Sequence, residues 1–188
     1  MKVTREEAQR NRERIVEAAA RRFRERGFEG IGVAELMKEA GLTHGGFYGH
    51  FDSKEQLMAE AVARAMERSK DLWSRRAAAA PGDPLAALAR LYLTPRHRDD
   101  PGSGCVVAAL ASDVARQGPA VRGALVEGLQ RSFALLAGLF EGLTPAARRR
   151  KAIATYASWV GALLLARAAA DDEALSREIL DAVARDKS

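Results

Sequence analysis

The chain has very little cysteine and no long apolar run, and these absences exclude several classes of protein. Its 188 residues contain one cysteine, Cys105, so no disulfide can form within the chain and a disulfide-framed secreted module is excluded. No stretch reaches the roughly 18–20 apolar residues that a membrane span needs; the nearest candidate, residues 156–170, is interrupted by Arg167. The first residues also lack the apolar segment of a signal peptide. We therefore expect a cytoplasmic protein with no membrane partner.

Motifs for catalysis and for metal or cofactor binding are also absent. The sequence has no P-loop, no dinucleotide-binding fingerprint and no serine–histidine–aspartate order, so we expect no enzyme activity and no cofactor. His97, Asp99 and Asp100 are the only residues that resemble a metal cluster, but their spacing matches no standard site and arginines flank them. A solvated loop is the better interpretation. A catalytic body fused to a binding head stays an alternative without residues to support it.

The residues that are present favour helices throughout. Ala, Leu, Arg and Glu dominate, all good helix formers, and the alternation typical of strands is missing. With 47% hydrophobic residues the chain is globular rather than disordered. We predict an all-α fold with one irregular stretch, residues 94–103. The predicted helices cover residues 4–26, 33–40, 44–50, 54–79, 85–93, 104–116, 121–143 and 145–170, and a last one begins after 171–172.

Positive charge is concentrated at the N-terminus. Lys and Arg together number 30 and Asp and Glu 25, which gives a formal net charge of +5. Residues 1–26 alone hold nine basic and five acidic residues. The excess allows a nucleic-acid partner. Because glutamates alternate with the arginines, a solvated helix face is as good an explanation as direct contact with a phosphate backbone.

Residues 33–51 carry the strongest motif. Two short helices, 33–40 and 44–50, are separated by a three-residue turn that begins with Gly41, which is the pattern of a helix-turn-helix. Gly41 can supply the positive φ of the turn, and Thr43 is expected to cap the second helix. That second helix is poor in helix-forming residues, because it contains Gly45, Gly46 and Gly49. Such a helix suits a surface that another molecule approaches closely, as in a DNA major groove.

These residues resemble the DNA-binding head of the TetR/AcrR family of bacterial transcriptional regulators. The resemblance covers residues 27–57 and rests on the run 40–43 (Ala-Gly-Leu-Thr), Phe47-Tyr48, Phe51 and Ser53-Lys54-Glu55. It implies a homodimer on a palindromic operator in double-stranded DNA, and repression relieved by a small-molecule effector. The expected domains are a helix-turn-helix DNA-binding domain, 1–54, and a helical effector-binding and dimerisation domain, 55–188.

The resemblance also implies residue roles in the head. Thr43, Tyr48 and Lys54 would contact phosphates, and the start of the second helix would face bases. One departure concerns the position before the first helix of the motif, where the family usually has Thr or Ser and this chain has Ile31 and Gly32. It is the only hint for an alternative, an interaction module that no longer binds DNA. The residues expected at the DNA are Thr43, His44, Gly45, Gly46, Tyr48, His50 and Lys54.

Aromatic residues on different predicted helices, together with the single cysteine, suggest an effector pocket. These side chains could converge on an apolar cavity with a few polar tips, although a plain core is an equally good interpretation. An effector held there would be small and mostly apolar or aromatic. The residues of this hypothesis are Tyr92, Cys105, Phe133, Tyr156 and Trp159.

Cys105 supports a second hypothesis. It stands at the start of an apolar helix, where the helix dipole favours an anionic sulfur. The Gly104-Cys105 start resembles that of electrophile- or oxidant-sensing members of the family, which implies a repressor that switches through this thiol. The alternative is a small buried hydrophobe, which free cysteines usually are.

The last two predicted helices have small and apolar faces. In the family resembled, they pair with the same helices of a second subunit, and two-fold symmetry makes such an interface isologous. Intramolecular packing alone is the alternative. The residues expected at the dimer interface are Ile153, Val160, Gly161, Leu164, Leu175, Ile179 and Val183.

Overall fold

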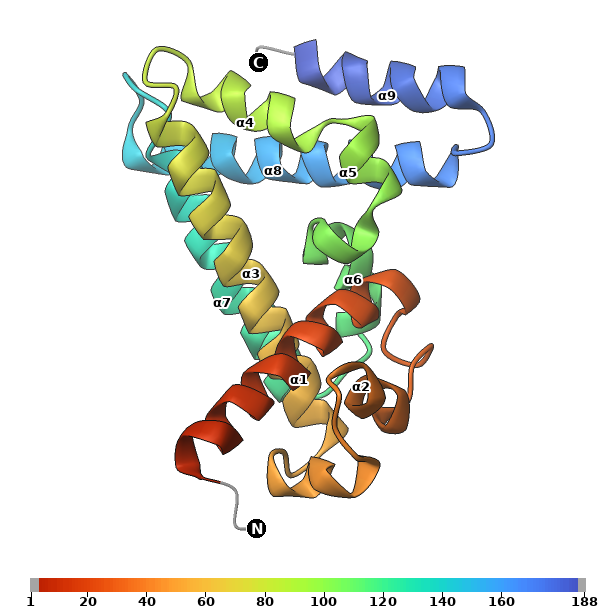
Figure 1. The fold of residues 1–188 in the computed structure, drawn as a ribbon. Coiled ribbons are helices and arrows are strands. Elements are labelled where there is room, and N and C mark those ends of the chain that lie inside the picture. The colour runs from red at the N-terminus through yellow and green to blue at the C-terminus, as the bar shows by residue number, and fades with distance from the viewer. Residues whose placement is uncertain (1–3, 186–188) are drawn as a thin grey trace.

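The computed structural model describes residues 4–185, and within that range every regular element is a helix. The all-α prediction is confirmed. The elements in chain order are α1 (Arg5–Arg26), α2 (Val33–Glu39), η1 (His44–Gly49), α3 (Lys54–Ala78), α4 (Pro84–Tyr92), α5 (Pro95–Asp99), η2 (Pro101–Ser103), α6 (Val106–Val114), α7 (Pro119–Ala137), α8 (Pro145–Ala168) and α9 (Glu173–Arg185), where η marks a 3-10 helix (Figure 1).

Side-chain caps begin several of the long helices. Ser53 Oγ accepts the backbone N–H of Gln56 at 3.1 Å, and the Gln56 side chain accepts the N–H of Asp52 at 2.7 Å. The reciprocal pair therefore reaches one residue further back than a standard capping box. Thr144 caps α8 through the N–H of Ala147. These bonds satisfy N–H groups that the first turn of a helix cannot pair internally.

The N-terminal helices form a small layer at one end of the molecule. α1 packs across the start of α3, and α2 and η1 pack beneath it (Figure 1). The residues buried between them are apolar and include Ile15, Ala19, Phe23, Leu36, Met37, Phe47 and Phe51. This shared core fixes the orientation of η1 relative to α1.

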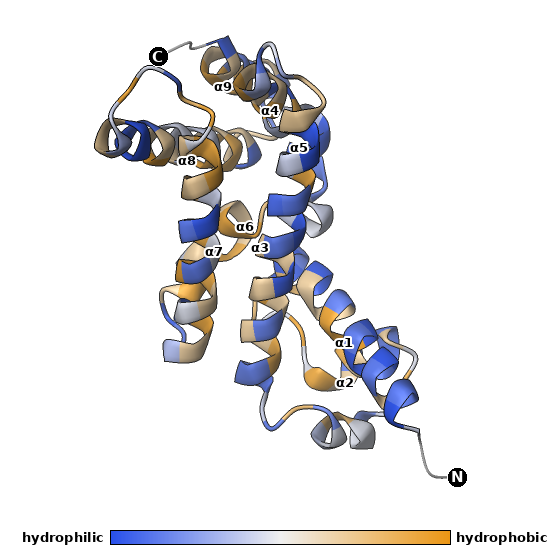
Figure 2. Cartoon of the chain, turned by 90° about the vertical axis from the view of Figure 1, so that its left-hand side faces the viewer, coloured by the Kyte–Doolittle hydropathy of each residue, from blue (hydrophilic) through white to orange (hydrophobic). Residues whose placement is uncertain are grey.

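The long helices α3 and α7 run side by side and lead from this layer to the opposite end (Figures 1 and 2). Gly128 of α7 faces Met66 so closely that an added Cβ would lie 2.5 Å from Met66 Cγ. At the far end α8 and α9 pack against each other. The predicted helix over 121–143 is too long, because α7 ends at Ala137 and Gly142 takes a positive φ of 68°.

We call residues 94–105 the strap. The prediction that residues 94–103 are irregular is wrong. Thr94 caps α5 through the N–H of His97 at 3.1 Å, and Asp100 caps η2 through the N–H of Ser103 at 3.2 Å. Two short helices therefore form in a stretch that has no helical periodicity, because side-chain caps and prolines begin each one.

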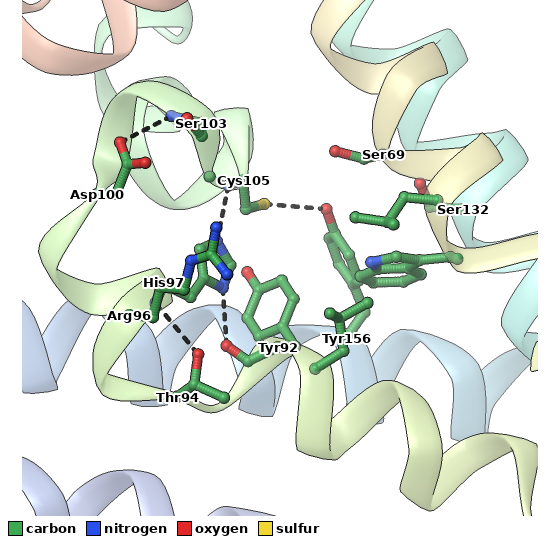
Figure 3. A pocket seen from close by; sticks show the side chains of 14 residues that line it. Ser69, Tyr92, Thr94, Arg96, His97, Asp100, Ser103, Cys105, Ser132 and Tyr156 are labelled. Atoms are coloured by element: carbon green, nitrogen blue, oxygen red, sulfur yellow. Dashed lines mark hydrogen bonds between the residues drawn. The ribbon is translucent and has the colours of Figure 1, made fainter. Parts of the chain in front are cut away.

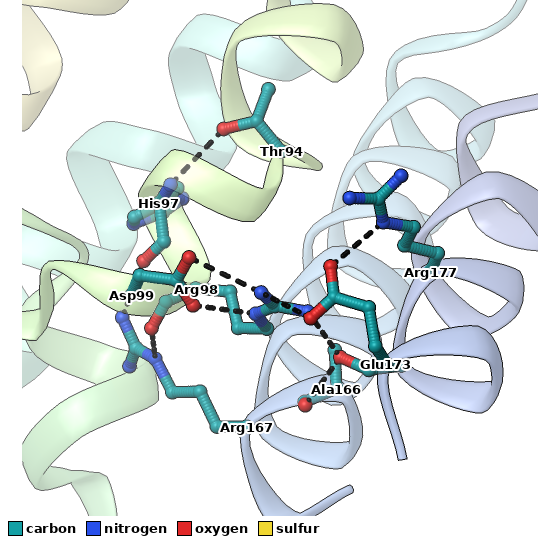
Figure 4. Close-up of polar contacts among 9 residues, drawn as sticks. Thr94, His97, Arg98, Asp99, Ala166, Arg167, Glu173 and Arg177 are labelled. Atoms are coloured by element: carbon teal, nitrogen blue, oxygen red, sulfur yellow. Dashed lines mark hydrogen bonds and ion pairs between the residues drawn. The ribbon is translucent and has the colours of Figure 1, made fainter. Parts of the chain in front are cut away.

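Hydrogen bonds tie the strap to the C-terminal helices. Arg167 of α8 donates to the carbonyl oxygens of His97 and Arg98 at 2.9 and 3.0 Å. Arg98 is itself buried and donates to Ser176 at 2.8 Å, with Glu173 3.4 Å away (Figure 4). Because these bonds use the strap's own carbonyls and a buried guanidinium, α5 is held firmly against α8 and α9.

None of the helices in residues 4–185 has both the length and the apolar character required for a membrane span.

Candidate DNA-binding face and ligand cavity

The turn of the helix-turn-helix has the geometry that its glycine predicts. Gly41 has a φ of +70°, a region that side chains with a Cβ rarely adopt. Its N–H donates to Lys38 O at 3.0 Å, and the N–H of Leu42 donates to Met37 O at 2.8 Å. This pair of bonds is a Schellman motif, which ends α2 and turns the chain toward the second helix.

The second helix of the motif is a 3-10 helix rather than an α-helix. Its bonds span three residues, as in Gly46 N–H to Thr43 O at 3.0 Å. Three glycines in six residues explain the departure, since glycine loses most entropy in a regular helix. Thr43 occupies the N-cap position but its side chain makes no capping bond, so the capping prediction is wrong and the hydroxyl stays exposed. Phe47 anchors the helix by stacking on Phe51, with ring centroids 5.5 Å apart.

The outer face of η1 is bare backbone flanked by polar side chains. A Cβ built on Gly45 or Gly49 would meet nothing within 4 Å, and neither has a positive φ. The fold therefore does not itself require these glycines, and a partner can approach the backbone there. Tyr48 projects beside them with 74% of its surface exposed. Thr43 and His44 are also exposed, and His50 is half-buried.

Lys54 already has one partner. It is half-buried, and its Nζ donates to the carbonyl oxygen of Phe28 at 2.6 Å. An ammonium group has three N–H bonds, so two remain for other acceptors. The bond also holds the start of α3 against the loop that follows α1.

Many arginines of α1 are paired within the molecule. Arg12 forms a bidentate pair with Glu60 and lies 4.4 Å from the centre of the Phe51 ring. The hydrogen bond to Glu60 raises the pKa of Arg12 above its ordinary value. Further ion pairs join Arg21 and Arg22 to Glu25, Arg22 to Glu39, and Arg26 to Glu35. Much of the positive charge of α1 is therefore balanced by neighbouring carboxylates.

A cavity of about 290 Å³ lies between α3, α4, the strap and α8 (Figure 3). Three residues of the pocket hypothesis line it, namely Tyr92, Cys105 and Tyr156. The other two lie behind this lining: the Trp159 ring centre is 5.8 Å from that of Tyr92, and the Phe133 ring centre is 5.7 Å from that of Tyr156. The complete lining is Ser69, Leu72, Trp73, Leu91, Tyr92, Thr94, Arg96, His97, Asp100, Ser103, Gly104, Cys105, Ser132 and Tyr156.

His97 belongs to this site, although the sequence suggested a solvated loop. Its Nδ1 lies 2.7 Å from the carbonyl oxygen of Tyr92, and its Nε2 lies 2.9 Å from the backbone nitrogen of Cys105. Because the Cys105 N–H must donate, Nε2 accepts and Nδ1 carries the proton. Burial lowers the pKa of His97 below its ordinary value, in agreement with a neutral ring. The spacing of residues in the sequence does not indicate that His97 lines a cavity.

The three polar groups at the buried end of the cavity are Cys105 and two tyrosines. Cys105 Sγ lies 3.6 Å from Tyr156 Oη. Tyr92 Oη is buried and has no hydrogen-bond partner. Burial first, and then the neighbouring Cys105, raise the pKa of both Tyr92 and Tyr156 well above the ordinary value. Both phenols are therefore neutral groups that can donate a hydrogen bond.

At the far end, α8 and α9 leave apolar side chains uncovered. Ile153, Leu164 and Leu175 are exposed, and a Cβ on Gly161 would meet nothing within 4 Å. The remaining residues expected at a dimer interface are half-buried, namely Val160, Ile179 and Val183. The face is thus open enough for another helix to approach closely.

Comparisons with known proteins agree with this architecture. The family model for bacterial regulatory proteins of the tetR family matches residues 15–61. The transcriptional regulator AcrR of Shigella flexneri is 33% identical over 90 residues, which are 48% of this chain and 42% of that protein. The chain thus spans less than half the length of such relatives. The transcriptional repressor NemR of Escherichia coli is 26% identical over 89% of both chains. The crystal structure of reduced E. coli NemR superposes with a TM-score of 0.77 and 25% identity over 93% of this chain and 94% of that one.

The fold and the motif define an all-helical protein that presents a helix-turn-helix at its N-terminal end. Residues 15–61 match the tetR family of bacterial regulatory proteins, as the resemblance predicts, and the chain as a whole is similar in fold to the repressor NemR. The relatives of the chain are named as transcriptional regulators or repressors rather than as enzymes, which confirms the expectation that it is not an enzyme.

Proposed function

We propose that the protein is a homodimeric transcriptional repressor that binds a palindromic operator through η1 and releases it when a small molecule binds the cavity. The observation that carries the proposal is the bare face of η1. There a Cβ on Gly45 or Gly49 would meet no atom of the described residues within 4 Å, and Tyr48 and Thr43 stand exposed beside them. Residues 1–54 act as the DNA-binding domain and residues 55–188 as the effector-binding and dimerisation domain.

Polar groups around η1 would position the protein on the phosphate backbone. Hydroxyls, ammonium groups and helix N-termini are the usual partners of phosphate oxygens, and Thr43, Tyr48 and Lys54 supply them. His44, Gly45, Gly46 and His50 face the base edges. The lysines and arginines of the head would supply sequence-independent attraction that falls steeply with salt, although several arginines of α1 are already paired with carboxylates of the chain.

The open face of α8 and α9 would hold the second subunit. Two copies related by a two-fold axis bury the same patch on both partners, and the exposed Leu164 and Leu175 belong to this patch. The dimer then fixes the spacing of two η1 helices, which must match two half-sites of the operator.

Release of DNA requires an effector that binds the two states of the dimer with different affinities. The strap offers the route, because it lines the cavity and also contacts α1. A ligand that moves the strap would change the tilt of α1 and thus the distance between the two heads.

A salt-titrated binding assay with DNA from immediately upstream of the protein's own gene tests this function. We expect specific binding by two or more protomers per site, with affinity that falls steeply as salt rises, in the presence of excess unrelated DNA. Binding no tighter than to the competitor, at every salt concentration, would contradict the proposal.

A second candidate is a repressor that switches through Cys105. Its support is that the thiol lines the cavity and lies 3.6 Å from Tyr156 Oη, and that a relative along most of the chain has a structure described as its reduced form. Iodoacetamide would alkylate the sulfur, which forms a C–S bond while iodide and the thiol proton leave. Release of operator DNA by wild type but not by Cys105→Ser supports this candidate. A Cys105→Ser variant that keeps the response eliminates it.

A further inference from the structure

The buried polar groups of the cavity leave one hydrogen-bonding group without a partner. Ser132 Oγ donates to Gly128 O at 3.0 Å within its own helix. Both ring nitrogens of His97 bond to backbone groups, and Cys105 Sγ pairs with Tyr156 Oη. Only Tyr92 Oη lacks a partner among the buried side-chain polar atoms of residues 4–185.

The unpartnered hydroxyl points into the cavity. Tyr92 is only 3% exposed, and Figure 3 shows its oxygen turned toward the space beside Cys105 and Tyr156. The position of its ring is fixed, because it packs edge-on against His97 at 4.6 Å and against Trp73 at 5.8 Å between ring centroids. The hydroxyl therefore cannot swing out to solvent without disturbing two aromatic neighbours.

The charge of the lining restricts what can occupy this end. None of the buried residues that line the cavity is an aspartate, glutamate, lysine or arginine: they are Trp73, Tyr92, Cys105, Ser132 and Tyr156. The two charged lining residues, Arg96 and Asp100, lie nearer the surface, and Asp100 already caps η2. Burying a charged group without a partner is costly, so an ion is disfavoured there.

We propose that the cavity binds a small uncharged molecule with one carbonyl oxygen, and that Tyr92 Oη selects it by donating a hydrogen bond to that oxygen. This proposal rests on the proposed function and specifies the chemical class of its effector. A phenol donor left unpaired in a buried site costs free energy that an acceptor restores. The remaining contacts of such a molecule would be apolar, with Trp73, Leu72 and Leu91. A volume of about 290 Å³ limits it to one or two rings.

The experiment compares three molecules of one shape with the purified protein in the absence of DNA. α-Tetralone carries the carbonyl oxygen, its exocyclic alkene analogue replaces that oxygen by a methylene group, and tetralin carboxylate carries a charge. None of the three adds to a thiol, so binding is independent of any chemistry at Cys105. Calorimetry, with quenching of tryptophan fluorescence as a second readout, gives each affinity.

Wild-type protein should bind the ketone about five- to tenfold more tightly than the alkene, which corresponds to one neutral hydrogen bond, and should bind the carboxylate most weakly. Tyr92→Phe should abolish the preference for the ketone while it keeps the affinity for the alkene. Tyr156→Phe is the comparison variant, because its hydroxyl already pairs with Cys105, and it should keep the preference.

The unfolding temperature of Tyr92→Phe without ligand separates recognition from structure. Because the hydroxyl has no partner among residues 4–185, its removal should leave that temperature unchanged or raise it. A clear fall would overturn the proposal, as would equal affinity of wild type for ketone and alkene, tighter binding of the carboxylate, or no binding of any of the three. These outcomes do not depend on operator binding, so a failure of the DNA assay is a separate result.

Discussion

The guanidinium of Arg24 on α1 donates to the carbonyl oxygen of Gly102 on the strap, with Nε at 2.8 Å and Nη2 also bonded. Both residues are buried. Burial lowers the pKa of Arg24 to about 10. A Cβ on Gly102 would lie 2.3 Å from Glu25 Oε1, so glycine allows this close approach. The bond joins the DNA-binding helices directly to a segment that lines the cavity.

Replacing Arg24 by methionine should lower the free energy of unfolding by about 1–3 kcal/mol, because the Gly102 carbonyl is then left buried without a donor. Chemical denaturation measures the change. Arg21→Met is the matched control, since Arg21 lies on the same helix in a solvent-exposed pair with Glu25, and it should have little effect. Equal losses in the two variants would show that the buried bond does not contribute.

Stability should fall with pH below about 6.5, the ordinary pKa of histidine, in a way that depends on His97. Burial, together with the nearby Arg167, lowers the pKa of His97 in the folded protein. These effects outweigh the hydrogen bond to Tyr92 and the charge of Asp100, which raise the pKa. As the pH falls, His97 is therefore protonated in the unfolded chain before it is protonated in the folded protein. The protein loses stability from the ordinary pKa of histidine down to the lower pKa of His97 in the folded state. His97→Gln should flatten this dependence between pH 7.5 and 5. His44→Gln, at an exposed histidine, should not.

Gly45→Ala should weaken operator binding without harming the fold. A methyl group there would meet no atom of the part of the chain that the structure describes within 4 Å, but it would stand between the backbone and the bases. The free energy of unfolding should stay the same or rise by up to about 1 kcal/mol, since alanine costs less entropy than glycine in a helix. Gly123→Ala, at an equally open position on α7, should keep full DNA affinity. If Gly45→Ala bound the operator as tightly as wild type does, Gly45 would not face the bases.

Tyr48→Phe and Lys54→Met should weaken binding to all DNA sequences alike, because phosphate contacts carry no sequence information. Losing the Lys54 charge should also reduce the slope of log affinity against log salt by about 1, whereas losing the neutral Tyr48 hydroxyl should leave the slope unchanged. Titrations on operator and unrelated DNA give both quantities. A change in base preference with either variant would refute the assignment.

Leu164→Glu should convert the dimer to a monomer, because a charge in an apolar interface is left without a partner. Sedimentation velocity measures the change, and operator affinity should fall with it. Val126→Glu is the comparison, since Val126 is equally exposed but lies on α7. A Leu164→Glu protein that sediments like wild type would move the interface to another face.

Local signals account for what the sequence could predict of the fold. The positive φ at Gly41 and the caps at Ser53 and Thr144 depend on residues within a turn of one another, and the structure has them. The type of the second helix in the motif was not predictable in the same way. Three glycines indicate a weak helix, but they do not by themselves specify the 3-10 geometry, and the packing of Phe47 on Phe51 depends on the tertiary fold.

The residues around the cavity could not all be predicted from local sequence signals. Aromatic residues from separate helices do lie together beside the cavity, but periodicity cannot distinguish a lining residue such as Tyr92 from Trp159, which lies behind it. His97 was interpreted as part of a solvated loop because its neighbours in sequence are charged. Its role depends on bonds to the backbone of Tyr92 and Cys105, and these form only when the chain from 92 to 105 folds around the ring.

Connections between helices usually tolerate insertions, because few of their backbone groups are committed. The strap is an exception: its carbonyls at His97, Arg98 and Gly102 accept from arginines on α8 and α1. An epitope tag or reporter domain placed there would disconnect both ends of the molecule. The turn at 81–83 is the better site for such a graft, since it is exposed and Gly82 has open space around it.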